Sequence, residues 1–505
     1  MPDVESVDPR TGEVRLVVGP ETTAHEVHEI CVRARAAHRT IRTLGRAWRA
    51  GLLRAMADVL ESGRELVVTT ADAETALGTD RLNGELTRTC FQLRMFADVV
   101  DDGGFLEVVI DHAGPTDMGP RPDLRRMLVP VGPTAVFGAS NFPLAFSVPG
   151  GDTASALAAG NPVIVKAHES HPATALLCAA LMTEAATAVG APEGTIGIVF
   201  GRAAGAQLVQ HPEISAVGFT GSPSGGRALM RLAEARPAPI PFYGELGSLN
   251  PVVVTAAAAA ERAEEVGQGL AASFTLGVGQ FCTKPGLAFV PSGPDGDVLV
   301  ASAAAVIEAG QSRVMLNAQI GEAFQRQLAS LKSCLGVREV AATPQRDADG
   351  RSARAHLLEV SSQDLIDSMF EECFGPVSMV VRYDDVADLL PVLARVPPSL
   401  TATLHTGSDE GAVDGALREV LEEAAGRIVY NGFPTGVAVS WAQHHGGAWP
   451  ASNSLHTSVG ATAVRRFLRP RAWQDAPTAL LPVELRDEPC GIPRRVDGVV
   501  VPTPA

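Results

Sequence analysis

The residues best suited to chemistry in this chain are a cysteine and a glutamate, each flanked by glycines. Cys282 stands in Gly279-Gln280-Phe281-Cys282-Thr283-Lys284-Pro285-Gly286, and Glu245 stands upstream in Gly244-Glu245-Leu246-Gly247. A thiolate is a strong nucleophile at neutral pH, and burial raises the pKa of a carboxylate toward that of a general base. We therefore expect a nucleophile and a base on two neighbouring loops. A helix beginning directly after Cys282 would lower the pKa of its thiol.

Each of these residues also has a purely structural interpretation. A free cysteine usually fills space in a core, and a single glutamate usually lies on the solvated surface. Asn141, in Ser140-Asn141-Phe142-Pro143, is either a turn residue or an amide donor for an oxyanion. The glycines around Cys282 and the apolar run before Glu245 favour the catalytic interpretation.

Composition limits the class of protein. The 505 residues are 46% apolar and 19% charged, as in globular proteins of two or three domains. A net charge of −16 disfavours nucleic acid and anionic membranes as partners. We see no signal peptide, and no apolar run approaches the roughly 18–20 residues that span a bilayer. Seven scattered cysteines are typical of the reducing cytoplasm, where we expect this protein.

The elements that must position these residues alternate between strands and helices. Residues 26–100 have helical spacing, and 342–355 is polar enough for a surface loop. We expect strands at 127–131, 133–137, 163–166, 195–199, 216–220, 251–254, 287–290, 378–381 and 401–405, with helices at 172–189, 203–209, 226–235 and 266–276. This alternation predicts an α/β fold with two parallel sheets, whose ligands lie at the carboxyl ends of the strands.

Polar residues follow several of these strands. Lys166 and Glu169 could bond ribose hydroxyls, and Ser222 could contact a pyrophosphate at a helix N-terminus. The alternatives are a solvated Lys–Glu pair and an ordinary turn. The twelve histidines show no metal-binding spacing, so we predict no metal. We interpret His444-His445 as part of a loop.

Together these motifs resemble the aldehyde dehydrogenase superfamily over nearly the whole chain. The resemblance rests on motifs in family order: Ser140-Asn141-Phe142-Pro143, Val165-Lys166, Phe219-Thr220-Gly221-Ser222, Glu245-Leu246-Gly247, Gly279-Gln280-Phe281-Cys282 and Glu371-Glu372-Cys373-Phe374-Gly375-Pro376. Other segments resemble the α-ketoglutaric semialdehyde (2,5-dioxovalerate) dehydrogenase branch, including Asn431-Gly432-Phe433-Pro434-Thr435-Gly436-Val437 and Arg465-Arg466-Phe467-Leu468-Arg469-Pro470. The same branch includes NADP-linked fatty aldehyde dehydrogenases.

The resemblance implies a fold of two Rossmann-type parallel-sheet domains and a small β oligomerisation element. The implied dinucleotide-binding domain covers 1–104 and 128–246, the catalytic domain 247–440, and the oligomerisation element 105–127 and 480–505. A homodimer or homotetramer is expected. The implied cofactor-binding residues are Phe137, Lys166, Glu169, Gly201, Gly221, Ser222, Leu246, Glu372 and Phe374.

The resemblance also implies a reaction. Cys282 would attack an aldehyde, with Asn141 and the Cys282 N–H holding the oxyanion, and Glu245 would activate water to hydrolyse the thioester. The cofactor is NAD or NADP. The carboxylate of Glu169 would repel a 2′-phosphate, which favours NAD.

The aldehyde itself stays open between several candidates. The branch motifs favour α-ketoglutaric semialdehyde, which gives 2-oxoglutarate, and a broad fatty or aromatic aldehyde dehydrogenase is the alternative. An arginine deep in the substrate tunnel would favour the former. A CoA-acylating enzyme is disfavoured because Glu245 supplies a base for water. A non-catalytic cofactor-binding protein is disfavoured because Cys282, Glu245 and Asn141 are all present.

Overall fold

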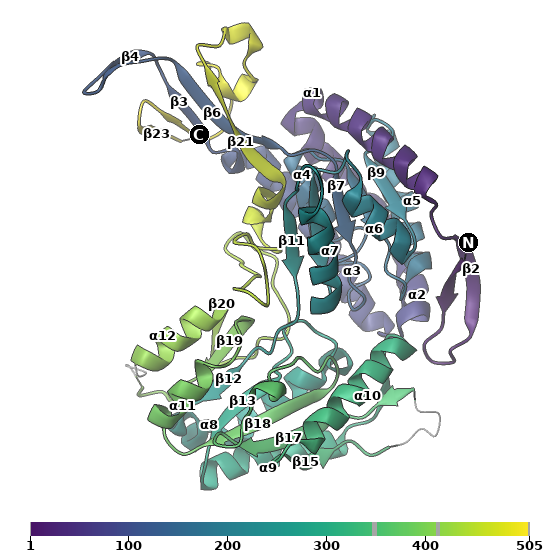
Figure 1. The fold of residues 1–505 in the computed structure, drawn as a ribbon, viewed down its shortest axis with the longest axis vertical. Coiled ribbons are helices and arrows are strands. Elements are labelled where there is room, and N and C mark those ends of the chain that lie inside the picture. The colour runs from purple at the N-terminus through teal and green to yellow at the C-terminus, as the bar shows by residue number, and fades with distance from the viewer. Residues whose placement is uncertain (1, 346–350, 411–414, 503–505) are drawn as a thin grey trace.

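The computed structural model describes residues 2–345, 351–410 and 415–502. Two α/β lobes lie one above the other, and a β arm projects from the upper lobe (Figure 1). Within the described residues, none of the helices is both long enough and apolar enough to cross a membrane.

The upper lobe is built on a five-stranded parallel sheet in the order β11-β10-β7-β8-β9. Its strands are β7 (Thr134–Phe137), β8 (Val163–Lys166), β9 (Ile196–Val199), β10 (Ala216–Thr220) and β11 (Phe242–Glu245). Its helices are α1 (Ala24–Ser62), α2 (Arg64–Thr75), α3 (Thr79–Asp102), α4 (Gly151–Ala159), α5 (Pro172–Ala188), α6 (Arg202–Gln210) and α7 (Pro223–Glu234).

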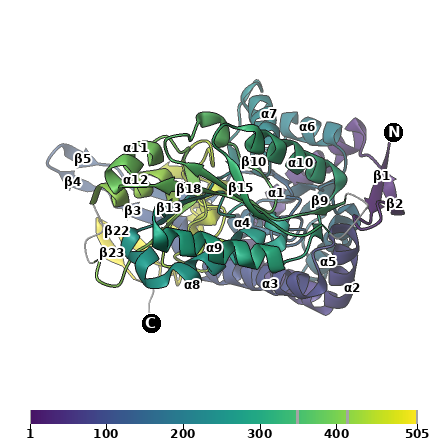
Figure 2. The ribbon, with the colours of Figure 1, turned by 90° about the horizontal axis from the view of Figure 1, so that it is seen from below.

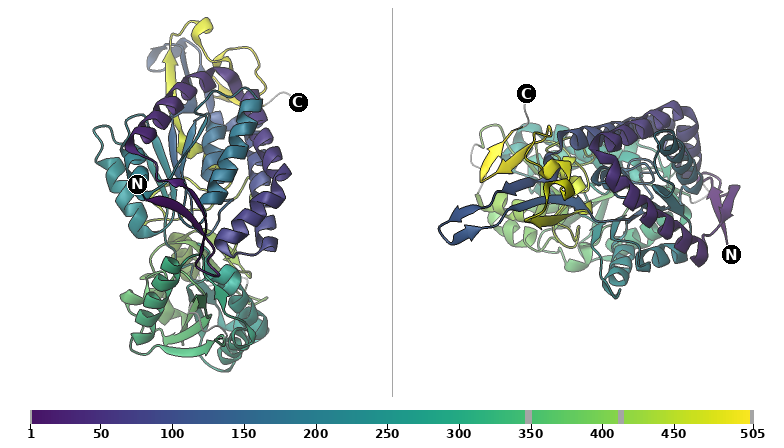
Figure 3. Two further views of the ribbon diagram at one scale, coloured as in Figure 1. Left: turned by 90° about the vertical axis from the view of Figure 1, so that its right-hand side faces the viewer. Right: turned by 90° about the horizontal axis from the view of Figure 1, so that it is seen from above.

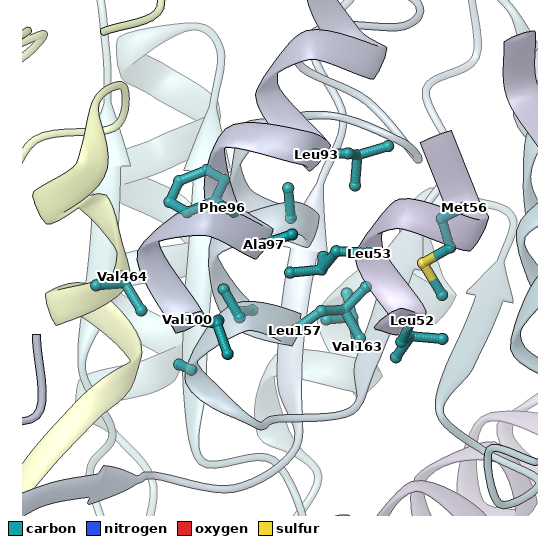
Figure 4. Close-up of a cluster of buried hydrophobic side chains, with 14 of the residues drawn as sticks. Leu52, Leu53, Met56, Leu93, Phe96, Ala97, Val100, Leu157, Val163 and Val464 are labelled. Carbon is teal, nitrogen blue, oxygen red and sulfur yellow. The ribbon is translucent and has the colours of Figure 1, made fainter. Parts of the chain in front are cut away.

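Alternating strand residues bury the two faces of this sheet in separate cores. Val163 and Val165 pack with α3, α4 and α5, whereas Ile164 packs with α6 and the first half of α1. Figure 4 shows the first core, where Leu53 and Met56 of α1 lie near Leu93 of α3 and other apolar side chains. Because both faces are covered, the strands are apolar throughout and the polar residues fall at their ends.

The lower lobe holds a seven-stranded sheet in the order β15-β17-β18-β13-β12-β19-β20, parallel except for β15. The strands are β12 (Val252–Val254), β13 (Leu287–Pro291), β15 (Arg338–Ala342), β17 (His356–Ser361), β18 (Val377–Tyr383), β19 (Ser399–His405) and β20 (Ala425–Tyr430). Helices α8 (Ala256–Thr275) and α9 (Pro294–Ala309) cover one face. The other face carries α10 (Ala318–Ser333), α11 (Val386–Leu393) and α12 (Gly415–Ala424) (Figure 2).

The projecting arm is a third sheet in the order β21-β6-β3-β22-β23. Its strands are β3 (Val108–Asp111), β6 (Leu124–Pro130), β21 (Leu468–Gln474), β22 (Arg494–Val496) and β23 (Val499–Val501), and the hairpin β4 (Gly114–Thr116)–β5 (Gly119–Arg121) lies at its tip. The hairpin of β1 (Asp3–Val7) and β2 (Val14–Pro20) lies on the side of the upper lobe opposite the arm (Figure 3, right). A two-stranded ribbon, β14 (Arg313–Val314) with β16 (Ser352–Ala353), completes the described strands.

Most predicted strands coincide with observed ones, and those at 163–166 and 216–220 match residue for residue. Helix 226–235 begins earlier, at Pro223, and 266–276 belongs largely to the longer α8. Part of the predicted loop 342–355 forms β16, while 346–350 lies outside the described residues. The sheet of the arm also includes β21, which lies before residues 480–505, the carboxyl-terminal segment predicted for the oligomerisation element. The domain boundaries remain predictions.

A buried ion pair joins the upper lobe to the chain that enters the arm. Arg466, only 2% exposed, donates from Nη1 to Asp152 of α4 and from Nη2 to the carbonyl of Tyr243 at 2.7 Å. Tyr243 lies on β11, two residues before Glu245. A buried charge without its partner costs several kcal/mol, so this pair constrains the end of β11.

Replacing Asp152 with alanine should therefore lower the free energy of unfolding by about 3–5 kcal/mol, because Arg466 stays buried without its counter-charge. Urea denaturation followed by circular dichroism measures the loss. Asp98→Ala breaks an ion pair with Arg54 whose side chains are 42% and 64% exposed, and serves as the matched control. It should cost less than about 1 kcal/mol. Equal losses in the two variants would contradict this assignment.

Candidate active site

Cys282 lies in a loop whose path requires left-handed backbone. Gly277, Val278 and Gly279 all have positive φ, of 55°, 60° and 65°. A Cβ atom at Gly279 would lie 2.3 Å from the backbone of Gly375, so only glycine allows this close approach. Val278 is β-branched, and its positive φ is strained. The loop is thus held in a conformation that its own sequence does not favour.

Buried amide side chains hold this loop in place. Gln280 accepts a hydrogen bond from the N–H of Leu316 at 3.0 Å and donates to the carbonyl of Gly277 at 3.2 Å. Asn250 donates to the carbonyls of Cys282 and Lys284 at 2.8 and 2.9 Å. Because both side chains are fully buried, their bonds fix the position of Cys282 relative to the lower sheet.

Glu245 is the last residue of β11, and the prediction that it lies in a loop is wrong. Its carboxylate is buried and accepts two hydrogen bonds. Oε1 lies 2.9 Å from Nε2 of His445, and Oε2 lies 2.6 Å from Oγ of Ser458. The parallel sheet directs the strand end toward the lower lobe, which brings the carboxylate to the Cys282 loop.

His445 lies between Glu245 and Cys282. Its ring Nε2 contacts Glu245 and is also 3.6 Å from Sγ of Cys282. The backbone N–H of His445 donates to Oγ1 of Thr457 at 2.7 Å. Because a carboxylate only accepts, the bonding assigns the proton to Nε2. Nδ1 has no partner among the described residues. His445 was interpreted as a loop residue, and it does lie in a loop, but its side chain is part of this cluster.

The pKa values differ from the sequence-based expectation. Burial raises the pKa of Glu245, but the charge of His445 and hydrogen bonds from His445 and Ser458 outweigh it, so the pKa is lowered. Burial and the nearby charge of Glu245 raise the pKa of the Cys282 thiol. A turn rather than a helix follows Cys282, so no helix dipole lowers it. The prediction that burial raises the pKa of Glu245 is wrong for this structure, and so is the prediction that a helix lowers the pKa of Cys282.

This arrangement can activate the thiol through proton transfer. At neutral pH, Cys282 carries its proton, and the adjacent pair of Glu245 and His445 can receive it. The Nε2–H of His445 is then the hydrogen-bond donor nearest the thiolate. A buried carboxylate also orients the ring, as in other nucleophile–histidine–carboxylate sites.

Asn141 lies beside the same loop. Its Nδ2 donates to the backbone carbonyl of Gln280 at 2.9 Å. Arg81 donates to the backbone carbonyl of Asn141 at 2.6 Å. The N–H of Cys282 has no hydrogen-bond partner within the described part of the chain. The side chain of Asn141 and this N–H thus approach the nucleophile from neighbouring segments.

The predicted nucleotide-binding residues gather at the carboxyl edge of the upper sheet. Phe137, Lys166 and Glu245 end strands β7, β8 and β11. Gly201 and Ser222 are the N-cap residues of α6 and α7, with Gly221 directly before Ser222, whose Oγ accepts from Gly225 N–H at 3.3 Å. Strand ends and helix N-termini therefore meet at one edge, which is where dinucleotides bind such sheets.

Glu169 and Lys166 form an ion pair at this edge. Glu169 Oε1 lies 2.5 Å from Lys166 Nζ and 4.0 Å from Arg202 Nε. Burial raises the pKa of Glu169, but the positive charge of Lys166 and the hydrogen bond outweigh it and hold the pKa well below its usual value. Glu169 is therefore ionised at neutral pH.

Glu372 lies beside the segment that follows β11, where it contacts Gly247 and Ser248 next to Leu246. Its Oε2 accepts from Ser248 N–H at 3.3 Å, and a Cβ at Gly247 would lie 2.6 Å from that oxygen. Burial raises the pKa of Glu372 to about 7, although Lys284 opposes the shift. Within the described residues, the bond from Ser248 is the only hydrogen bond that the carboxylate accepts, so most of its acceptor capacity is free for sugar hydroxyls. Phe374 is half-buried two residues on.

The ligand atoms of Glu245, Cys282 and His445 all lie within 4.8 Å of one another. This set of thiolate, imidazole and carboxylate matches the donors that Zn²⁺ prefers. A metal held there would occupy the thiolate that covalent catalysis needs, so the absence of a metal remains our prediction.

His445 and Ser458 are the site residues that sequence reasoning missed. They lie 200 and 213 positions after Glu245, in a region without helices or strands. The only signal was the histidine itself, in a glycine-rich stretch, and its partner could not be read from spacing.

The chain is similar in sequence to one protein family and to named relatives within it. The profile of the aldehyde dehydrogenase family matches residues 2–471. Alpha-ketoglutaric semialdehyde dehydrogenase 2 of Azospirillum brasilense is 45% identical over 503 residues, which cover 98% of this chain and 96% of the relative. The alpha-ketoglutaric semialdehyde dehydrogenase of Acinetobacter baylyi is 40% identical, with 99% and 96% covered.

Solved structures show the same fold. PnpE, solved with nicotinamide adenine dinucleotide, matches with a TM-score of 0.80 at 22% identity, over 94% of this chain and 95% of that one.

The contact between His445 and Cys282 predicts that His445→Gln slows inactivation by iodoacetamide about 100-fold at pH 7.5, because the pair of Glu245 and His445 that can receive the thiol proton loses its imidazole. Loss of activity over time measures the rate at Cys282. His444→Gln, which removes the adjacent histidine, is the matched control and should react like the parent. An unchanged rate in His445→Gln would show that the contact has no role in activating the thiol.

Proposed function

This chain belongs to the aldehyde dehydrogenase family, and on that premise we propose that it oxidises α-ketoglutaric semialdehyde to 2-oxoglutarate. The observation that carries the proposal is the cluster of Cys282, His445 and Glu245 beside a nucleotide-type sheet edge. The names of the two relatives at 45% and 40% identity support the choice of substrate.

The reaction begins with the thiol. Its proton passes to the pair of Glu245 and His445, and the thiolate attacks the aldehyde carbon, which forms a thiohemiacetal. Asn141 Nδ2 and the N–H of Cys282 donate to the oxyanion. Preorganised donors of this type contribute several kcal/mol to transition-state stabilisation. A nicotinamide held at the sheet edge would supply the hydride acceptor, and loss of the hydride from this carbon to it would leave a thioester on Cys282.

Glu245 then has a second task. After the thiol proton has passed on to solvent, the Glu245 carboxylate takes a proton from a water molecule, which attacks the thioester carbon and releases the acid and the thiolate. The lowered pKa of Glu245 keeps it ionised for this step. A base at this position favours release to water rather than to coenzyme A.

A nicotinamide dinucleotide fits the residues at the sheet edge. Lys166 and Glu169 would hold the ribose of the adenosine half, and Ser222 with Gly221 would lie beside the pyrophosphate. Glu372, whose carboxylate accepts one 3.3 Å hydrogen bond from the part of the chain that the structure describes, would accept from the other ribose. Phe137, Gly201, Leu246 and Phe374 would line the site. The family uses NAD or NADP.

We propose NAD as the preferred cofactor, because the ionised Glu169 would repel a 2′-phosphate.

Glu169→Gln should therefore raise kcat/KM for NADP⁺ at least about tenfold, since Lys166 and Arg202 become free to bind the phosphate. Initial rates with each cofactor measure this. Glu193→Gln removes an exposed glutamate that precedes β9, at the opposite edge of the sheet, and should leave the ratio unchanged. A parent enzyme that already prefers NADP⁺ would contradict the proposal.

Arg88 supports a substrate that carries a carboxylate. This residue of α3 has both terminal nitrogens shielded from solvent and without a partner among the described residues. Its guanidinium stacks 5.1 Å from the ring of Phe146, which lies 6.4 Å from the ring of His445. Burial lowers the pKa of Arg88, whereas Glu85, Cys282 and Glu245 raise it by their charge. Arg88 therefore stands near Cys282 with Nη1 and Nη2 unpaired among the described residues, while its Nε donates to the carbonyl of Val437 at 3.4 Å.

The test is a panel of α-ketoglutaric semialdehyde, succinic semialdehyde and pentanal, followed by NADH formation. The parent should prefer the first substrate, and Arg88→Gln should lower kcat/KM for the two carboxylates about 100-fold, mainly through KM. Pentanal should react nearly as before.

Arg94→Gln, which removes an exposed arginine from the same helix, is the control. Preference of the parent for pentanal would refute the proposed substrate in favour of a broad aldehyde dehydrogenase. An equal loss of kcat/KM with all three substrates in Arg88→Gln would instead show that Arg88 acts on the Cys282 thiolate and does not bind the substrate carboxylate.

We also propose a homodimer or homotetramer in the cytoplasm. The arm ends in β23, where Val499 and Val500 are 66% and 59% exposed, as expected for a strand that a second subunit covers. The seven cysteines are all free, which suits a reducing compartment.

A further inference from the structure

A second cationic site lies far from Cys282, where the arm joins the upper lobe. A cavity of about 280 Å³ opens between the first half of α1 and strands β6 and β21. It is lined by Arg35, His38, Arg39, Arg42, Val129, Pro130, Val131, Arg469 and Arg471. This concentration of positive charge is unexpected on a protein with a net charge of −16.

Four of the five arginines that line this cavity have no counter-charge among the described residues. Arg35 pairs with Glu213 at 2.6 Å. The other arginines, Arg39, Arg42, Arg469 and Arg471, have no carboxylate within ion-pair distance in the described part of the chain. Like charges held together without an anion repel one another, so the bare cavity is electrostatically unfavourable.

A buried histidine is among the residues that line the cavity. His38 is 7% exposed, and its Nδ1 has no hydrogen-bond partner among the described residues. Burial, then Arg35 and Arg42, lower the pKa of His38 to about 4. Burial, then Arg469 and Arg42, lower the pKa of Arg471. The positive charges from α1 and β21 therefore act on the same small volume.

The elements around the cavity hold the cations apart and in place. Alternate residues of β21 share one face of the strand, so Arg469 and Arg471 point the same way, and β21 pairs with β6 along its length. Arg39 and Arg42 are one helical turn apart on α1, just before its break at Gly45. Two rigid elements thus present two guanidinium groups each across a gap of ligand size.

We propose that this cavity binds a small polyanion, a phosphate or carboxylate compound with at least two negative charges. Guanidinium forks from α1 and β21 would bind its oxygens in pairs, and His38 could add a donor when protonated. Such a ligand would connect the upper lobe to the arm. This site does not depend on the reaction at Cys282.

Calorimetric titration of the full-length protein with pyrophosphate and with citrate tests the proposal and distinguishes the two ligand classes. Binding of at least one should be measurable below 1 mM in low salt, should raise the melting temperature, and should weaken with added NaCl. Arg42→Ala combined with Arg469→Ala should reduce affinity at least about tenfold. The control, Arg54→Ala with Arg94→Ala, removes two exposed arginines and should bind like the parent.

Failure of both anions to bind at 1 mM would overturn the proposal, as would equal affinity in the parent and the cavity variant. The cavity variant must keep its circular dichroism spectrum and NADH formation, which excludes misfolding as the cause. If the cavity variant instead changes the oligomeric state in light scattering and neither anion binds, a second subunit covers the cavity and the small-ligand proposal is wrong.

Discussion

The buried charge of Glu245 is the constraint on which the rest of this structure depends. A carboxylate removed from water must be matched by donors, or it becomes protonated and loses its use as a base. Here the donors are His445 and Ser458, which belong to a segment far along the chain without helices or strands. Satisfying one charge therefore fixes that segment against the end of β11, and places the imidazole against Cys282.

Other features follow from the same requirement. The Cys282 loop must reach across from the lower lobe, and it does so through consecutive positive-φ residues and the glycine contact at Gly375. Buried amides of Gln280 and Asn250 hold this strained path. On the opposite side, the pair of Arg466 and Asp152 supports β11 close to Glu245. The upper lobe thus contributes Glu245 and the lower lobe Cys282, and buried polar contacts set their separation.

The sequence predicted what depends on local pattern. The parallel strands are short apolar runs, and the glycine-flanked Cys282 and Glu245 stood out from their neighbours. It could not predict contacts made only in three dimensions. The role of His445 depends on a partner 200 residues away, and the lowered pKa of Glu245 depends on that same contact. Helices α9 and α10 were not expected, because α9 is apolar on most sides and its spacing is hard to distinguish from that of a buried strand.

We propose that Cys282 carries the substrate as a thioester and that Glu245 provides the base for its hydrolysis. Mass spectrometry of acid-quenched enzyme, mixed with α-ketoglutaric semialdehyde and NAD⁺, tests it most directly. We predict an acyl adduct on the peptide that contains Cys282, more abundant in Glu245→Gln than in the parent. An adduct on another cysteine, or turnover without any adduct in either protein, would contradict the account.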